Sequence, residues 1–169
     1  MILTTPRLIL RPMSAEDVDP LLTLFGDPSF MAAFDAPVFD RSRMQAWVRA
    51  NLEHQDRWGY GLFTIVARDG GDVIGDCGIE TMEIDGRVES ELGYDLRRDM
   101  WGRGLAPEAA TAVAGYAFAE LGLARLVSLV RHQNGRSARV AQKIGMKATG
   151  RLRRGDVEYM VYAMESPQP

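Results

Sequence analysis

The ten residues from Trp101 to Ala110, WGRGLAPEAA, constrain this chain more than any other segment. Two glycines flank Arg103, and a helix-forming run follows them at once. Glycine adopts positive φ at little cost, so such a turn can direct several backbone N–H groups toward one point. The first turn of the following helix adds unpaired N–H groups and the positive end of the helix dipole. The segment therefore predicts either a phosphate or pyrophosphate site or a tight turn from a strand into a helix.

Two common phosphate-binding motifs are missing from the sequence. The turn is not a G-x-G-x-x-G segment of the dinucleotide-binding kind, and no G-x-x-x-x-G-K-[ST] occurs anywhere in the chain. Neither dinucleotide nor P-loop chemistry is therefore expected.

Length, charge and cysteine content narrow the class of protein. The 169 residues are expected to form a single domain, 1–169. No apolar run approaches the roughly 18–20 residues that span a bilayer, and a net charge of −3 argues against general nucleic-acid binding. Cys77 is the only cysteine, which excludes an internal disulfide and a cysteine-based metal site, so no metal is expected. Residues 1–11 lack the long apolar core of a signal peptide, so we expect a cytoplasmic protein without membrane or nucleic-acid partners.

Helical and strand patterns alternate along the chain. Apolar residues three and four positions apart predict helices, and apolar runs between glycine- and aspartate-rich turns, such as Asp85-Gly86, predict strands. This order predicts an α/β (α+β) protein. Strands are predicted over 5–11, 60–67, 73–82, 88–96, 123–130, 147–153 and 157–164, and helices over 18–25, 30–34, from Asp40 onward, over 107–121, and from Asn134 to Gly145.

Five motifs in this order resemble one family. They are Thr5–Arg11 (TPRLILR), Glu91–Tyr94 (ELGY), Trp101–Ala106 (WGRGLA), Asn134–Ser137 (NGRS) and Lys143–Met146 (KIGM). The chain resembles the GCN5-related N-acetyltransferases (GNAT), and among them the RimJ/RimL-like subgroup that acetylates ribosomal-protein N-termini. The resemblance covers nearly the whole chain. It implies the GNAT fold, a mixed, mostly antiparallel sheet of about seven strands that is splayed between strands 4 and 5 and flanked by helices.

The resemblance implies acetyl-CoA as cosubstrate. Gly104 and Ala106 match the last two fixed positions of the family's pyrophosphate signature, (Gln/Arg)-x-x-Gly-x-(Gly/Ala), whereas Trp101 stands at its first position. Arg103 either adds a charged contact to the phosphates or is a solvated loop residue. The other cofactor-binding residues implied are Gly102 and Leu105 in the turn, the free strand edge around Leu96, and Asn134 with Ser137 at the start of the next helix.

Asn134 has two roles open to it. The family's asparagine at this position contacts the pantetheine arm, whereas an asparagine at a helix start also serves as an N-cap. The two roles are compatible.

Acetyl transfer to an amine needs a base, because a protonated amine is not a nucleophile. Glu91 falls where several family members carry a catalytic glutamate on this strand, so it is the first candidate. Glu89 points to the same face two residues away, and Glu80 on the preceding strand is a third candidate. A glutamate on a strand is also commonly just a solvated residue. A backbone N–H after Leu96 is expected to hold the thioester carbonyl oxygen.

The tyrosine that many members of the family use as the general acid is absent here. It lies seven residues after the helix-start asparagine, and Ala141 occupies that position in this chain. Ser137 either donates to the leaving sulfur or satisfies backbone groups of the helix start, and a thiolate with a pKa near ~8.5 also leaves without a dedicated acid. Cys77 has no histidine nearby in sequence to activate it, so we expect direct transfer in a ternary complex rather than an acetylated cysteine.

The acceptor is expected to be a primary amine. A protein N-terminal amine and a small-molecule amine, such as an antibiotic or polyamine, both remain open, because the loops 27–40 and 151–156 would set this choice. Phe34, Trp47 and Trp58 are candidates for lining the acceptor site. A non-catalytic acyl-CoA-binding regulatory protein is a third alternative, and both a monomer and a homodimer remain open.

Overall fold

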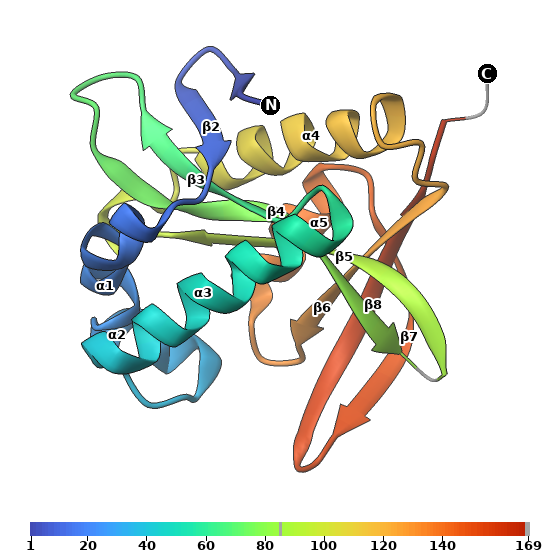
Figure 1. Cartoon of the computed structure of the whole chain (residues 1–169). Helices are drawn as coiled ribbons and strands as arrows, with labels where there is room; N and C mark the ends of the chain where they lie inside the picture. The colour runs from blue at the N-terminus through green and yellow to red at the C-terminus, as the bar shows by residue number, and fades with distance from the viewer. Residues whose placement is uncertain (85, 168–169) are drawn as a thin grey trace.

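The computed structural model describes residues 1–84 and 86–167, in which eight strands form one sheet in the order β1-β2-β3-β4-β5-β6-β8-β7 (Figure 1). All neighbouring strands are antiparallel except β5 and β6, which are parallel. The strands are β1 Leu3–Thr4, β2 Leu8–Pro12, β3 Leu62–Ala67, β4 Val73–Ile84, β5 Arg87–Leu96, β6 Arg125–Arg131, β7 Lys147–Arg154 and β8 Val157–Glu165. The α-helices are α1 Val18–Phe25, α2 Pro28–Met31, α3 Arg41–Trp58, α4 Leu105–Ala119 and α5 Gly135–Lys143, and the 3-10 helices are η1 Ala15–Asp17, η2 Ala32–Phe34 and η3 Arg98–Met100.

The GNAT fold class is confirmed, with one more strand than expected. The additional strand is β1, which precedes the predicted first strand, and residues 5–7 at the start of that predicted strand form a turn between β1 and β2. Pro6 has no N–H for a sheet ladder, and the Thr5 hydroxyl accepts the Leu8 N–H at 3.0 Å, which closes the turn. The turn predicted at Asp85-Gly86 includes residue 85, which lies outside the described residues.

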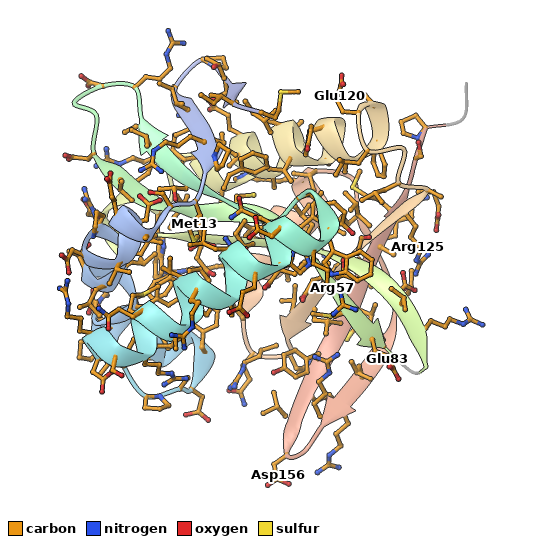
Figure 2. All side chains as sticks on the ribbon, viewed as in Figure 1. Met13, Arg57, Glu83, Glu120, Arg125 and Asp156 are labelled. Carbon is orange, nitrogen blue, oxygen red and sulfur yellow. The ribbon has the colours of Figure 1, made fainter. Side chains whose placement is uncertain are left out.

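The helices cover both faces of the sheet. On one face, α1, α2 and α3 pack around a core that contains Leu21, Phe30 and Met44. On the other face, α4 and α5 pack around a core that contains Val113 and Ala141. No helix in the described part of the chain is long and apolar enough to cross a membrane. The β7–β8 hairpin projects away from both layers, with Asp156 near its tip (Figure 2).

The centre of the sheet is splayed. The parallel strands β5 and β6 are in register at a single pair, Glu91 opposite Val127, and separate beyond it. The strand order on either side is continuous, so the molecule has two sheet halves joined at this pair. The C-terminal end of β5 therefore has an edge that no strand covers.

Candidate active site

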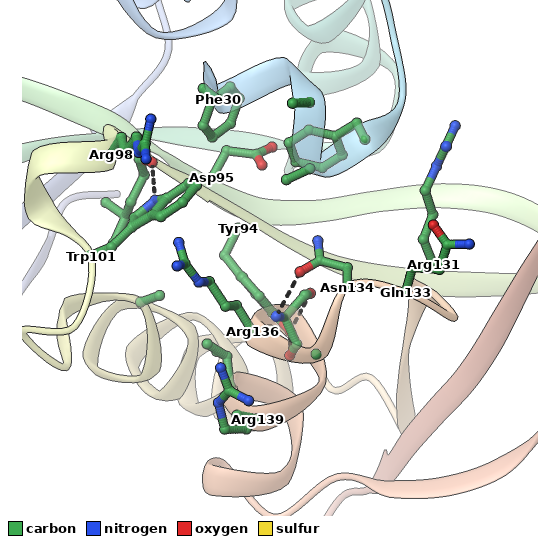
Figure 3. A pocket seen from close by; sticks show the side chains of 18 of the residues that line it. Phe30, Tyr94, Asp95, Arg98, Trp101, Arg131, Gln133, Asn134, Arg136 and Arg139 are labelled. Atoms are coloured by element: carbon green, nitrogen blue, oxygen red, sulfur yellow. Dashed lines mark hydrogen bonds between the residues drawn. The ribbon is translucent and has the colours of Figure 1, made fainter. Parts of the chain in front are cut away.

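A cleft of about 1140 Å³ opens where β5 and β6 separate (Figure 3). One wall comes from the end of β5, residues 94–96, and from the turn that leads into α4. The opposite wall comes from the end of β6 and the first turns of α5, and α2 with η2 closes one end. Residues 156–158 of the β7–β8 hairpin also line the cleft, so four separate segments of the sequence meet in one site.

The turn before α4 has the geometry expected of an anion site. Gly102 and Gly104 have φ of +76° and +75°, in the left-handed region that favours glycine. Gly104 is the N-cap of α4, and no side chain caps this helix, so its first N–H groups are left for another acceptor. A Cβ at Gly102 would meet nothing within 4 Å, so backbone conformation rather than space requires glycine there.

The same turn is anchored by the N-terminal segment. Arg7 donates from Nη1 to the Arg103 carbonyl at 2.8 Å and from Nε to the Glu108 carboxylate at 2.7 Å. The Thr5 hydroxyl donates to the other Glu108 oxygen at 2.6 Å. Burial opposes ionisation of Glu108, but these hydrogen bonds outweigh it and lower its pKa. Arg103 thus contributes its carbonyl to this anchor, and its side chain is not among those that line the cleft.

Basic side chains line the cleft, and sequence reasoning had missed them. Three of them follow one another on α5 at spacings of three and four residues, which was the available signal in the sequence. The Arg136 guanidinium lies 4.4 Å from the centre of the Trp101 ring, so it stacks across the cleft. Such a cluster suits a ligand with several phosphate charges. The basic lining residues are Arg98, Arg131, Arg136, Arg139 and Lys143.

The free edge at Leu96 is partly occupied by a side chain. The Trp101 indole N–H donates to the Leu96 carbonyl at 2.7 Å, which gives the residue at the first signature position a structural role. The Arg97 N–H donates to Ile74 of β4, so Arg97 faces β4, and the backbone groups of Leu96 and Tyr94 face the opposite side, toward the cleft. The Leu96 N–H and the Tyr94 carbonyl are therefore the groups that this edge offers to a ligand.

Asn134 and Ser137 lie on the opposite wall, with a partner that sequence reasoning had not named. The Asn134 side-chain oxygen accepts the Ser137 N–H at 3.1 Å, which confirms Asn134 as an N-cap and leaves its amide NH₂ for a ligand. The Tyr94 hydroxyl donates to the Ser137 carbonyl at 2.8 Å. The Ser137 hydroxyl in turn lies 3.2 Å from the Tyr94 hydroxyl. Burial raises the pKa of Tyr94 to about 12. Ala141 is fully buried in the α4–α5 core, where it offers no proton donor.

The three candidate glutamates have different surroundings. Glu91 is not among the residues that line the cleft, and its carboxylate accepts the Leu129 N–H of β6 at 3.1 Å. Burial raises its pKa to about 7 against the effect of that N–H, with the Glu80 charge adding to the rise. Burial also raises the pKa of Glu80, and Glu89 lies 3.5 Å from the Arg125 guanidinium. The role of Glu91 as the catalytic base remains a prediction.

The end of the cleft under α2 and η2 is aromatic. Phe30 and Phe34 have ring centres 5.2 Å apart, and both line the cleft. The Asp95 carboxylate points toward Phe30, on the opposite side of β5 from Tyr94 (Figure 3). Trp47 instead packs against a core phenylalanine, and neither Trp47 nor the exposed Trp58 lines the cleft.

Cys77 is fully buried under the α4 layer, and burial raises the pKa of its thiol well above the ordinary value. It therefore has neither the access nor the thiolate character of a nucleophile. Among residues 1–84 and 86–167, no three histidine, cysteine, aspartate or glutamate side chains are grouped as metal ligands.

Comparison with known proteins identifies the family of this chain. The family described as the acetyltransferase (GNAT) domain matches residues 7–147. The uncharacterized protein YkkB of Bacillus subtilis is 33% identical over 165 residues, which cover 97% of this chain and 95% of YkkB. The crystal structure of an acetyltransferase from Agrobacterium tumefaciens is 33% identical, with a TM-score of 0.84 over 98% of this chain and 94% of that one. A structure of RimL, described as a ribosomal L7/L12 α-N-protein acetyltransferase in complex with coenzyme A, shares the fold at 19% identity, with a TM-score of 0.83 over 98% of each chain. The chain belongs to the GNAT family of acetyltransferases.

Proposed function

We propose that residues 1–169 form one domain that transfers an acetyl group from acetyl-CoA to a primary amine by direct attack. The observation that carries this proposal is the continuous cleft that joins a glycine turn, an uncovered strand edge and a carboxylate. An anion nest and a free β-edge in one cleft match the two chemically different parts of coenzyme A, its phosphates and its pantetheine amides.

The residues that are present fit this cosubstrate. The N–H groups at Gly104, Leu105 and Ala106 suit the pyrophosphate, and glycine at 102 keeps the turn in the required conformation. The basic side chains of the opposite wall suit the remaining phosphate charge. The Tyr94 carbonyl on the uncovered strand edge offers an acceptor to a pantetheine amide N–H.

Around the reacting atoms, each group of the chain has a defined task. The acetyl thioester supplies an electrophilic carbonyl carbon. The Arg97 N–H, which follows Leu96, is engaged with the Ile74 carbonyl, so the Leu96 N–H is the donor that we propose for the carbonyl oxygen. The Ser137 hydroxyl, which donates to the Tyr94 hydroxyl at 3.2 Å, is the group that we propose stabilises the departing thiolate. The buried Cys77 is inaccessible, which favours direct transfer.

A protein N-terminal amine is the acceptor that the RimL likeness favours, and a small-molecule amine is its rival. The acceptor end of the cleft is lined by Phe30 and Phe34, so it suits an amine attached to an apolar group.

Calorimetry with acetyl-CoA and a screen for CoA release test the proposal together. The screen presents peptides with free N-termini, the same peptides with blocked N-termini, and a set of small amines that includes polyamines. Acetyl-CoA binding with release of CoA only in the presence of free amines is the expected result. Binding without turnover on any amine would favour a regulatory acyl-CoA-binding protein, and no binding would reject the proposal.

A further inference from the structure

A row of polar side chains crosses the sheet on the face that carries α1 to α3. Arg11 of β2 lies opposite Thr64 of β3, Thr64 lies opposite Asp76 of β4, and Asp76 lies opposite Asp95 of β5. Directly opposite residues of antiparallel strands have their side chains on one face, with Cβ atoms about 4.5–5.5 Å apart. Two carboxyl groups are thus adjacent at the end of the row that reaches the cleft.

Another buried aspartate in the same region shows how this fold normally neutralises a carboxylate. Asp17, which is 1% exposed, accepts hydrogen bonds from the Arg11 guanidinium at 2.5 and 2.8 Å, the Ser14 N–H at 2.8 Å and the Thr64 hydroxyl at 2.8 Å. Burial opposes its ionisation, but these partners outweigh burial and lower its pKa.

Asp76 is equally buried, at 1% exposure, and has no such partners. One of its carboxylate oxygens is buried without a hydrogen bond, and no basic side chain pairs with Asp76 or Asp95 among the described residues. An uncompensated buried carboxyl next to a second carboxyl destabilises a fold, so packing alone does not account for this pair.

Asp95 is the member of this pair that reaches a ligand. It lines the cleft between Tyr94 and Leu96, and its carboxylate points toward Phe30 at the acceptor end (Figure 3). Because side chains alternate along a strand, Asp95 is on the opposite face of β5 from Tyr94 and its partner Ser137. A thioester held at the Leu96 N–H would have the hydroxyl pair on one side and the Asp95 carboxylate on the other.

We propose that Asp95 is the residue that takes the proton from the acceptor amine. This inference rests on the proposed function of the site. An ammonium N–H bond breaks and the proton passes to an Asp95 oxygen. The nitrogen lone pair then forms the bond to the acetyl carbonyl carbon, the C–S bond breaks, and the thiolate leaves with the electron pair. Two protons leave the nitrogen in all, one of them neutralising the thiolate and the other passing through Asp95 to solvent.

The electrostatics of the pair agree with this role. Burial raises the pKa of Asp95 to about 7, and the charge of Glu80 adds to the rise. Burial, with the charges of Asp95 and Glu80, raises the pKa of Asp76 well above its ordinary value. The other charged side chains at this part of the cleft are Asp35, after η2, and Arg98 of η3. A base near neutrality combines an ionised form with proton affinity high enough to act on an amine.

A titration of the free protein tests the carboxyl without any acceptor. In protein labelled with ¹³C at the aspartate carboxyl carbon, one signal is expected to titrate near pH 7 and to be missing in Asp95→Asn. In Glu80→Gln, that signal is expected to titrate at lower pH, because a like charge has been removed. If Asp95→Asn keeps every aspartate signal that titrates near neutrality, Asp95 does not have the proposed basicity.

Kinetics with the best amine from the screen test the chemical role. We expect Asp95→Asn to lower kcat by about 10²–10⁴-fold with acetyl-CoA affinity unchanged in calorimetry. Glu80→Gln is expected to move the acidic limb of kcat to lower pH, which a merely structural residue would not do. Asp56→Asn, at an exposed site on α3, is the matched control and should behave as the unaltered protein.

The rival assignment and the proposed function fail in different ways. A loss of kcat in Glu91→Gln with a normal rate in Asp95→Asn would assign the base to Glu91 and overturn the inference while the enzyme remains an acetyltransferase. Failure of the unaltered protein to bind acetyl-CoA, or to acetylate any amine, would instead reject the proposed function.

Discussion

Asp95→Asn is expected to make the protein more stable while making it less active. The pKa of Asp95 in the folded protein lies above its ordinary value because of burial and the Glu80 charge. Folding then favours the protonated form. The Asp95 charge therefore destabilises the folded protein. This destabilisation is absent below the unfolded pKa of about 3.9, grows as the pH rises from there toward about 7, and is constant above that value. Asparagine has no charge to bury, so the gain in stability should follow the same pH dependence.

The size of this gain follows from the two pKa values. The difference between 3.8 and about 7 corresponds to about 4 kcal/mol at 1.36 kcal/mol per pH unit. Because Asp95 lines the cleft, water and relaxation reduce the penalty, and we expect roughly 2–4 kcal/mol at pH 8. At about 2–4 °C per kcal/mol for a chain of this length, the melting temperature should rise by roughly 5–15 °C.

Thermal unfolding of both proteins without ligand, at each half pH unit from 4 to 8, measures this directly. The difference in Tm should be close to zero at pH 4 and largest above pH 7. A difference that does not change with pH, or a less stable variant at pH 8, would refute the claim that the Asp95 charge is buried without compensation.

Asp17→Asn is the matched control with the opposite sign. Its carboxylate is paired with Arg11, so its removal should destabilise by about 3–5 kcal/mol near neutrality and by less as the pH falls.

Three further predictions concern the cofactor wall and the order of chemical steps. Gly104→Val should leave the circular dichroism spectrum unchanged but weaken acetyl-CoA binding at least about tenfold in calorimetry, because valine is strained at a φ of +75°; unchanged affinity would remove the turn from the binding site. Arg7→Gln should release the Arg103 carbonyl and weaken acetyl-CoA binding by about three- to tenfold, roughly 1 kcal/mol for the lost hydrogen bonds, with partial rescue in Arg7→Lys. Cys77→Ala should keep most of the activity, with intersecting double-reciprocal plots, because the thiol is inaccessible; parallel plots and an acetylated Cys77 in the mass spectrum would contradict direct transfer.

The helix starts and the central turn were predictable because their chemistry is local. Asn134 caps α5 through its own third neighbour, and the glycines before α4 adopt the positive φ that their identity suggested. The short strand β1 and the turn after it were not predicted, although the cause of the turn is also local. The turn depends on the Thr5 hydroxyl, whose hydrogen bond with Leu8 competes with the strand that was predicted to begin at Thr5.

The carboxyl pair was harder to predict, because it depends on register between strands. Ile84 lies opposite Arg87, and counting back from this pair places Asp76 opposite Asp95. The sequence therefore contained the register. It did not indicate which face of the hairpin would carry α1 to α3 or that β6 would separate from β5, and these long-range facts place Asp95 in the cleft.

The hydrogen bond from the Leu129 N–H to Glu91 bears on how quickly a ligand can enter. If the parallel hydrogen-bond ladder simply ended here, the Leu129 N–H would have no acceptor, and β5 and β6 would tend to pair further to supply one. The glutamate oxygen replaces the missing main-chain acceptor, so the gap between β5 and β6 is a relaxed state of the free protein. A ligand that enters has no sheet to open and little backbone to reorder, which reduces the free energy lost on binding. Association should therefore be rapid, and free and bound backbones should superimpose closely near the junction.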